Sequence, residues 1–185
     1  MLRYLLIIVA LAYYMPLTAG AGDEKKSKVN WLTIEEALAL NEKEPKKIII
    51  DFYTDWCGWC KKMDKTTFNH PQIAKYLNKN FYAVKFDAEG KESVEYKDLE
   101  YKAGKAKGAG PRGGTHEFAY YMVNTNGSMG YPSIAFLDAE NDKITHVPSY
   151  LDAPTMDAVL KFFGDDHYKK ISWGVFEKTF KSRIK

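Results

Sequence analysis

Two cysteines separated by two residues are the side chains in this sequence with the clearest chemical potential. Cys57 and Cys60 are its only cysteines, and they enclose Gly58 and Trp59. Such a pair can exchange electrons with a partner disulfide, because one thiolate attacks and the second thiol resolves the mixed disulfide. A bridge across so short a loop restrains the unfolded chain very little. A purely structural staple therefore explains the pair poorly, and we expect thiol–disulfide exchange.

The elements that the sequence places around the pair suit this chemistry. Residues 48–53 form a run that is apolar on both alternations, as expected of a central strand covered by helices on two sides. A helix is predicted to begin at Cys57 and to continue through Met63. At a helix start, the first cysteine faces unpaired N–H groups and the positive end of the helix dipole, which favours its thiolate. We therefore assign Cys57 as the nucleophile and Cys60 as the resolving thiol.

Zinc sites use the same cysteine spacing, and this alternative stays open. A structural zinc site usually needs four protein ligands. The histidines of the chain form no second cluster with metal-ligand spacing; they are His70, His116, His146 and His167. We expect no bound metal and no other cofactor.

The remaining pattern predicts alternating helices and strands in one domain. The spacing of apolar residues predicts helices at residues 33–41, 71–78, 116–123 and 152–163, and further strands at 81–87, 134–137 and 143–147. Thr33 and Thr115 are the expected N-caps of their helices. A helical crossover between residues 48–53 and 81–87 predicts that these two strands are parallel.

Three segments depart from this alternation. Residues 94–96 and 99–101 alternate apolar and polar side chains and predict a small β-hairpin. Residues 104–114 contain five glycines without the order of a phosphate-binding loop, and we interpret them as a mobile loop beside the active site. The tail, residues 165–185, is aromatic and is expected to dock on the domain as a short helix.

The N-terminus has the layout of a cleaved signal peptide, predicted over residues 1–21. One positive charge precedes an apolar run and a segment of small residues. An uncleaved membrane anchor is the alternative, but a spanning helix needs about 20 apolar residues, and Pro16 ends this run early. Residues 22–30 are predicted to be a flexible leader before the domain at 31–185. The mature protein would then be periplasmic or secreted, without stable membrane insertion.

The charge balance does not point to nucleic acid. Cleavage of residues 1–21 removes Arg3 as the only charged residue, which lowers the formal net charge from +3 to +2. Lysines are spread along the chain, as on an ordinary solvated surface. We expect a monomer that binds no nucleic acid.

Residues 51–61, DFYTDWCGWCK, resemble the active-site segment of thioredoxins, with Trp59 in place of the usual proline between the cysteines. The resemblance covers residues 31–163. It implies an α/β, three-layer thioredoxin-like fold, in which helices flank a central mixed sheet and residues 89–114 insert a β-hairpin and a glycine-rich loop. The sequence is also similar to exported thioredoxin-like proteins of Bacteroidetes type and to the thioredoxin-like domains of periplasmic disulfide reductases. We interpret Arg112 and His116, in a segment that fits this likeness, as supporting a helix start; contact with the thiols or with a partner is the alternative.

The resemblance implies roles for further residues. Asp51 falls where the family has a buried carboxylate that relays a proton to or from the resolving cysteine, and Lys85 falls where a lysine pairs with that carboxylate. Burial would raise the pKa of Asp51 and let it accept the proton of the resolving thiol. Pro132 falls at the cis-proline, whose loop lies against the cysteine pair. The implied substrate groove contains Trp56, Trp59, Tyr131 and Pro132.

Each of these positions also has a plainer explanation that the sequence leaves open. Asp51 could end a strand pairing, Lys85 could face solvent, and Pro132 could be an ordinary trans proline in a turn. Their order along the chain favours the functional interpretation of all three.

The predicted function is that of an exported thiol–disulfide oxidoreductase that reduces disulfides of periplasmic proteins. Trp59 adds no positive charge between the cysteines, which favours a reductase over a strong oxidase. Its partners would be exported protein disulfides or thiols and an unidentified electron donor in the membrane. Oxidase or isomerase activity is an alternative direction. A protein-binding module and a metal chaperone are alternatives in which the cysteines are not catalytic.

Overall fold

The computed structural model describes residues 28–104 and 114–184. The predicted signal peptide, most of the predicted leader and most of the glycine-rich stretch, including Arg112, lie outside the described residues. None of the helices in the described part of the chain is both long and apolar enough to cross a membrane.

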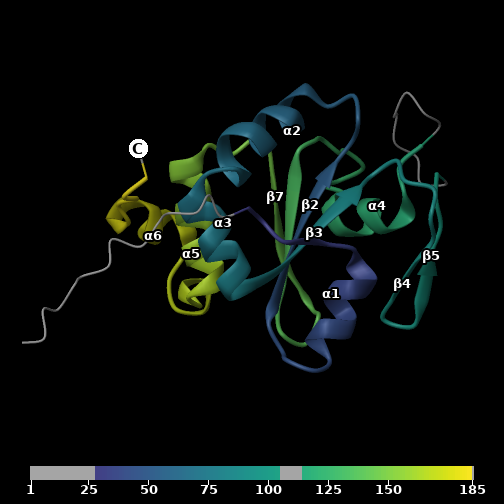
Figure 1. Cartoon of the computed structure of the whole chain (residues 1–185), viewed down its shortest axis with the longest axis horizontal. Coiled ribbons are helices and arrows are strands. Elements are labelled where there is room, and N and C mark those ends of the chain that lie inside the picture. The colour runs from purple at the N-terminus through teal and green to yellow at the C-terminus, as the bar shows by residue number, and fades with distance from the viewer. Residues whose placement is uncertain (1–27, 105–113, 185) are drawn as a thin grey trace, which may run out of the picture.

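A five-stranded mixed sheet forms the centre of the molecule (Figure 1). Its strands lie in the order β1-β3-β2-β6-β7, with β1, β3 and β2 mutually parallel and β6 and β7 antiparallel to their neighbours. The strands are β1 (Trp31–Leu32), β2 (Lys47–Tyr53), β3 (Phe81–Asp87), β6 (Ser133–Leu137) and β7 (Lys143–Pro148). The predicted parallel pairing of the strands around residues 48–53 and 81–87 is confirmed.

Helices cover both faces of this sheet, as the thioredoxin-like three-layer prediction requires. Figure 1 shows α3 and α5 on one side and α1 and α4 on the other. Successive side chains of β2 pack into opposite layers: Ile49 belongs to one buried cluster, and Ile48 and Ile50 belong to the other. The covering helices are α1 (Ile34–Asn41), α3 (Pro71–Asn80), α4 (Glu117–Val123) and α5 (Ala153–Gly164).

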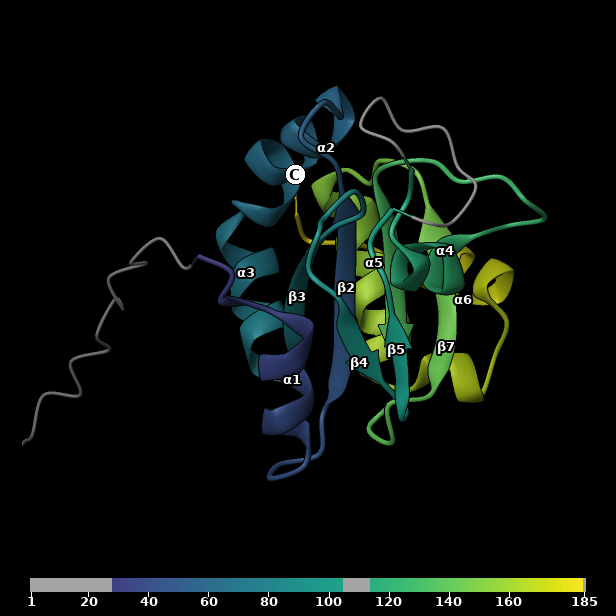
Figure 2. The same ribbon diagram turned by 90° about the vertical axis from the view of Figure 1, so that its right-hand side faces the viewer.

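A two-stranded hairpin, β4 (Val94–Tyr96) and β5 (Leu99–Tyr101), extends the α1/α4 layer. Figure 2, viewed from that side, shows the hairpin in front of the sheet and α5 behind it. The turn residues Lys97 and Asp98 have positive φ angles of 52° and 61°, which suits a two-residue turn between twisted strands. The predicted hairpin is therefore confirmed.

The C-terminal tail packs beside α5. After a short 3₁₀ turn, η2 (His167–Lys169), helix α6 (Trp173–Thr179) places the buried Phe176 ring 5.2 Å from that of Phe162. The predicted short helix in the tail is confirmed.

One local expectation needs correction, and one short strand was not predicted. Thr115 was expected to cap the helix at 116–123, but α4 begins at Glu117 and His116 is its N-cap. The His116 Nδ1 accepts the N–H of Phe118 at 3.0 Å, so the imidazole performs the task expected of the threonine hydroxyl. Strand β1 was not predicted, because its two residues carry no measurable periodicity and are held by pairing with β3.

The start of α1 provides a test of the local structure. The Thr33 hydroxyl accepts the N–H of Glu36 at 3.2 Å, and the Glu36 carboxylate accepts the N–H of Thr33 at 2.8 Å, a reciprocal capping box. We expect Thr33→Ala to lower the free energy of unfolding by about 1 kcal/mol in urea titrations. Glu35→Ala, in the same turn but outside the box, is the control. Equal losses for both variants would contradict the capping role.

Candidate active site

The cysteine pair lies where the central strand passes into a helix. Strand β2 ends at Tyr53, and helix α2 (Gly58–Met63) continues into the π-helical turn η1 (Asp64–Phe68). Cys57 is the N-cap of α2, and its backbone N–H donates to the carbonyl of Thr54 at 3.1 Å. The helix start predicted at Cys57 is therefore confirmed.

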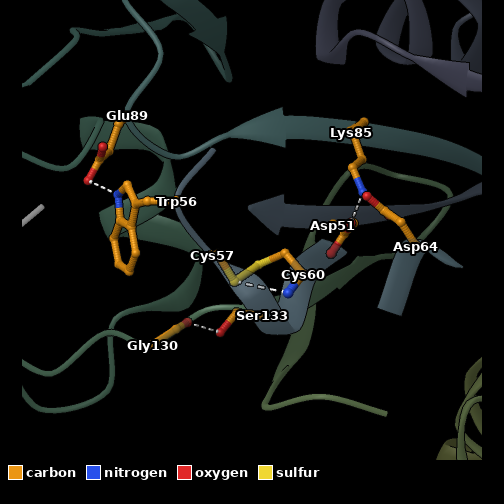
Figure 3. The surroundings of a disulfide bond; sticks show 9 residues. All are labelled: Asp51, Trp56, Cys57, Cys60, Asp64, Lys85, Glu89, Gly130 and Ser133. Carbon is orange, nitrogen blue, oxygen red and sulfur yellow. Dashed lines mark hydrogen bonds and ion pairs between the residues drawn. A yellow bond between two sulfur atoms is a disulfide. The ribbon is translucent and has the colours of Figure 1, made fainter. Parts of the chain in front are cut away.

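The two cysteines form a disulfide in this structure. The S–S distance is 2.08 Å and the Cα atoms are 5.3 Å apart. The Cys57 Sγ accepts the backbone N–H of Cys60 at 3.0 Å, as Figure 3 shows. Cys57 is 5% exposed and Cys60 is 2% exposed, so both residues are largely buried in the disulfide form and Cys57 is slightly the more exposed. An N–H donor and the helix dipole both stabilise negative charge on that sulfur.

A buried carboxylate lies behind the disulfide. Asp51 is 1% exposed and lies opposite Lys85 in the register of β2 and β3. The Lys85 Nζ is 2.6 Å from the Asp51 Oδ2 and also contacts the carboxylate of Asp64. Figure 3 shows Asp51 on the Cys60 side of this group, with Lys85 and Asp64 beyond it. The fold thus brings together Asp51 and Lys85, which were singled out from the sequence, and Asp64, which was not.

The electrostatics of this group follow from its burial. Burial raises the pKa of the Asp51 carboxyl from 3.8 to about 6, against the opposing effect of Lys85. Burial alone would lower the pKa of Lys85, but the charges and hydrogen bonds of Asp51 and Asp64 outweigh it and raise that pKa. The Asp51 Oδ1 is buried and has no hydrogen-bond partner among the described residues. This oxygen is free to take up a proton.

The loop before β6 meets the same end of the sheet. The peptide bond between Tyr131 and Pro132 is cis, as the resemblance implies. Ser133 pairs with Phe52 of β2, so Pro132 lies just beyond that strand, next to the segment that leads to Cys57. Figure 3 shows Gly130 and Ser133, which bracket this dipeptide, beside the disulfide.

Two exposed tryptophans flank the cysteines. Trp56 is 47% exposed, and its ring lies 6.2 Å from that of Tyr131 in an edge-on arrangement. Its indole N–H donates to the Glu89 carboxylate at 3.1 Å. Trp59 is 56% exposed, and its ring lies 5.3 Å from that of Tyr150. The four residues assigned to the substrate groove therefore lie on the two segments that carry the cysteines and the cis-proline.

Residues 34–164 match the family described as Thioredoxin-like domain. The chain belongs to this thioredoxin-like family. The match includes the cysteine pair, the strands around it and the cis-proline loop.

Curated relatives and a solved structure agree with this assignment. The chain is 25% identical over 143 residues to the thiol:disulfide interchange protein DsbD of Vibrio vulnificus, covering 74% of this chain and 20% of the relative. It is 29% identical over 129 residues to DsbD of Neisseria meningitidis serogroup B, covering 68% and 20%. The chain thus spans about a fifth of the length of these relatives. A thioredoxin-fold protein from Helicobacter pylori superimposes with a TM-score of 0.50 at 20% identity, over 72% of this chain and 79% of that one, which supports the fold.

Three contacts of this thioredoxin-like site were not foreseen from the sequence. Asp64 lies four residues after Cys60, so helical spacing could have placed it on the same face. Glu89 and Tyr150 offered no comparable signal, because loops bring them to the tryptophans.

His116 is fully buried, and its Nε2 lies 2.9 Å from the Glu92 carbonyl, which agrees with the expected support of a helix start.

The raised pKa of Asp51 predicts how stability depends on pH. Between about pH 4 and pH 6, the unfolded chain releases this proton while the folded protein retains it. The free energy of unfolding of the oxidised protein should therefore fall as pH rises through this window, relative to Asp51→Asn, by a difference on the order of 3 kcal/mol. Urea titrations at several pH values measure it.

Asp98→Asn, in the exposed hairpin turn, is the control for this comparison. It removes a carboxylate of the same kind without touching the buried group. A wild-type pH profile parallel to that of Asp51→Asn would show that Asp51 ionises in the folded protein as it does in the unfolded chain.

Proposed function

We propose that this protein is an exported thiol–disulfide oxidoreductase that reduces disulfides of exported proteins through Cys57 and Cys60. One observation carries the proposal: the two sulfurs meet at the start of α2, with a buried carboxylate whose free oxygen lies on the Cys60 side. Neither a structural staple nor a binding surface requires such a carboxylate behind the pair.

The residues divide the reaction into two steps. In the reduced protein, the Cys57 thiolate attacks a substrate disulfide, forms a bond to one substrate sulfur and releases the other as a thiol. Cys60 then attacks the Sγ of Cys57, which frees the second substrate thiol and closes the protein disulfide. Asp51 accepts the Cys60 proton during this second step, with Lys85 beside it to stabilise the charge. The substrate gains the two electrons that the protein dithiol loses.

The direction of the reaction follows from the residues between the cysteines. Neither Gly58 nor Trp59 carries a positive charge that would hold Cys57 as a thiolate and make the disulfide a strong oxidant. The protein would therefore act mainly as a reductase. A reductase must be recharged, and we assign this role to a dithiol donor in the membrane.

The cellular setting of the proposal rests on the sequence of residues 1–21. Cleavage of this apolar segment would release a monomeric domain into the periplasm or the medium. The relatives from Vibrio and Neisseria are named thiol:disulfide interchange proteins, which supports the same chemistry. In this setting Trp56, Trp59, Tyr131 and Pro132 would bind the substrate segment.

Reduction of insulin in the presence of dithiothreitol tests the activity. The wild type should accelerate precipitation of the insulin B chain, and Cys57→Ser should reduce the rate to that of dithiothreitol alone. Cys60→Ser should accumulate a mixed disulfide on Cys57, visible by mass spectrometry, because its resolving thiol is gone. A wild type no faster than Cys57→Ser would contradict the proposal and favour a binding module.

The role of Asp51 is tested separately. Asp51→Asn should slow resolution of the mixed disulfide at pH 7 by at least about tenfold, since general base catalysis supplies at least this much. Attack by Cys57 should keep its rate. Rapid-quench mass spectrometry follows both steps, and an equal slowing of both would point to a structural defect instead. Glu117→Gln, in the first turn of α4, serves as the control variant.

A further inference from the structure

Beside the cysteine pair, the substrate-groove residue Trp59 belongs to a group of side chains whose other two members have no assigned task. It consists of Trp59, Tyr150 and Lys62, which we call the aromatic shelf. The Lys62 Nζ lies 4.6 Å from the centroid of the Trp59 ring and 5.1 Å from that of the Tyr150 ring. Lys62 is exposed and makes no ion pair with any residue that the structure describes.

The shelf is held by hydrogen bonds to neighbouring elements. The Thr66 hydroxyl donates to the Lys62 carbonyl at 2.9 Å and lies 3.0 Å from the Tyr150 hydroxyl. Because the single Thr66 hydrogen is used, the Tyr150 hydroxyl is the donor of the second bond. Ser149, whose φ of 104° is rare for a residue other than glycine, donates its N–H to the Pro132 carbonyl at 2.9 Å. Tyr150 is therefore tied both to η1 and to the cis-proline loop.

This anchoring contrasts with the exposure of the shelf. Trp59 is 56% exposed although its ring contacts Tyr150 and the Lys62 ammonium lies over it, so much of the indole surface is left to water. Exposed aromatic surface that is held in place commonly marks a binding site. Lys61, Lys62 and Lys65 are all exposed along α2 and η1, where the one acidic residue, Asp64, pairs with Lys85, so this segment carries an excess of positive charge.

We propose that the aromatic shelf selects the client: it binds an aromatic residue next to the attacked cysteine and an acidic residue close to it. This inference rests on the proposed function. An aromatic client ring would pack on the exposed part of the Trp59 indole, beside Tyr150. A client carboxylate would pair with Lys62, whose ammonium already lies over the rings. Trp59 lies between the two cysteines in the sequence, and Tyr150 follows Ser149, whose N–H binds the Pro132 carbonyl, so neighbours of the client cysteine can reach the shelf.

A set of four peptides tests the two halves of the proposal. Each peptide carries one cysteine, disulfide-bonded to thionitrobenzoate, whose release is followed by absorbance. Phe or Ser flanks the cysteine, and Glu or Lys lies two residues away. Reduced wild type should react about tenfold faster with the Phe/Glu peptide than with the Ser/Lys peptide, which corresponds to a difference of about 1.4 kcal/mol.

Variants assign each half of this preference to a residue. Tyr150→Ala should reduce the preference for Phe over Ser to about twofold or less, and Lys62→Glu should reverse the preference for Glu over Lys. Tyr121→Ala and Lys79→Glu remove an exposed aromatic ring and an exposed charge elsewhere, and they should keep the wild-type pattern. Thermal unfolding of every variant checks the fold.

Reaction with bis(2-hydroxyethyl) disulfide, which has neither an aromatic ring nor a carboxylate, separates the possible outcomes. If the reduced wild type reacts with this compound but reacts with all four peptides at equal rates, the proposed role of the shelf is overturned and the proposed function stands. A preference that survives in both Tyr150→Ala and Lys62→Glu would also overturn it. A reduced wild type that reacts with no disulfide would overturn the proposed function itself.

Discussion

A carboxylate removed from water needs a compensating charge, and this chain supplies it through strand pairing. The register of β2 and β3 sets Asp51 opposite Lys85, and Figure 3 shows the Asp51 end of the resulting ion pair on the side of Cys60. A slip of one residue would turn Asp51 to the other face of the sheet and leave its charge buried without a partner. The pair therefore fixes the alignment of the central strands, and that alignment positions the cysteines.

The remaining parts of the site are consequences of this alignment. Strand β2 leads into α2 within a few residues, so Cys57 caps the helix and Cys60 faces inward. The antiparallel pairing of β2 with β6 brings the cis-proline loop to the same edge. The loop after β7 lies beside the cis-proline loop, because the backbone N–H of Ser149 donates to the carbonyl of Pro132. The groups to which we assign attack, proton transfer and client binding thus lie at one end of the sheet.

Local signals explain what could be predicted from the sequence. The capping residue Thr33, the doubly apolar run of β2 and the hairpin alternation each depend on neighbours in the chain, and each was predicted correctly. Asp51 and Lys85 were found through their spacing from the cysteines in a resemblance, not through local pattern. Features that depend on tertiary contact were missed: strand β1, the cap at His116, and the approach of Glu89 and Tyr150 to the tryptophans. A sequence reveals which residues could do chemistry more readily than which loops will hold them.

The central claim is that the cysteine pair passes reversibly between disulfide and dithiol within reach of a partner. Equilibration in dithiothreitol redox buffers, followed by acid quenching, alkylation and mass spectrometry, tests it most directly. We expect a single two-electron transition, two alkyl groups on the reduced protein, and faster labelling of Cys57 than of Cys60 at pH 6. A pair that stays oxidised in every buffer, or that labels first at Cys60, would contradict it.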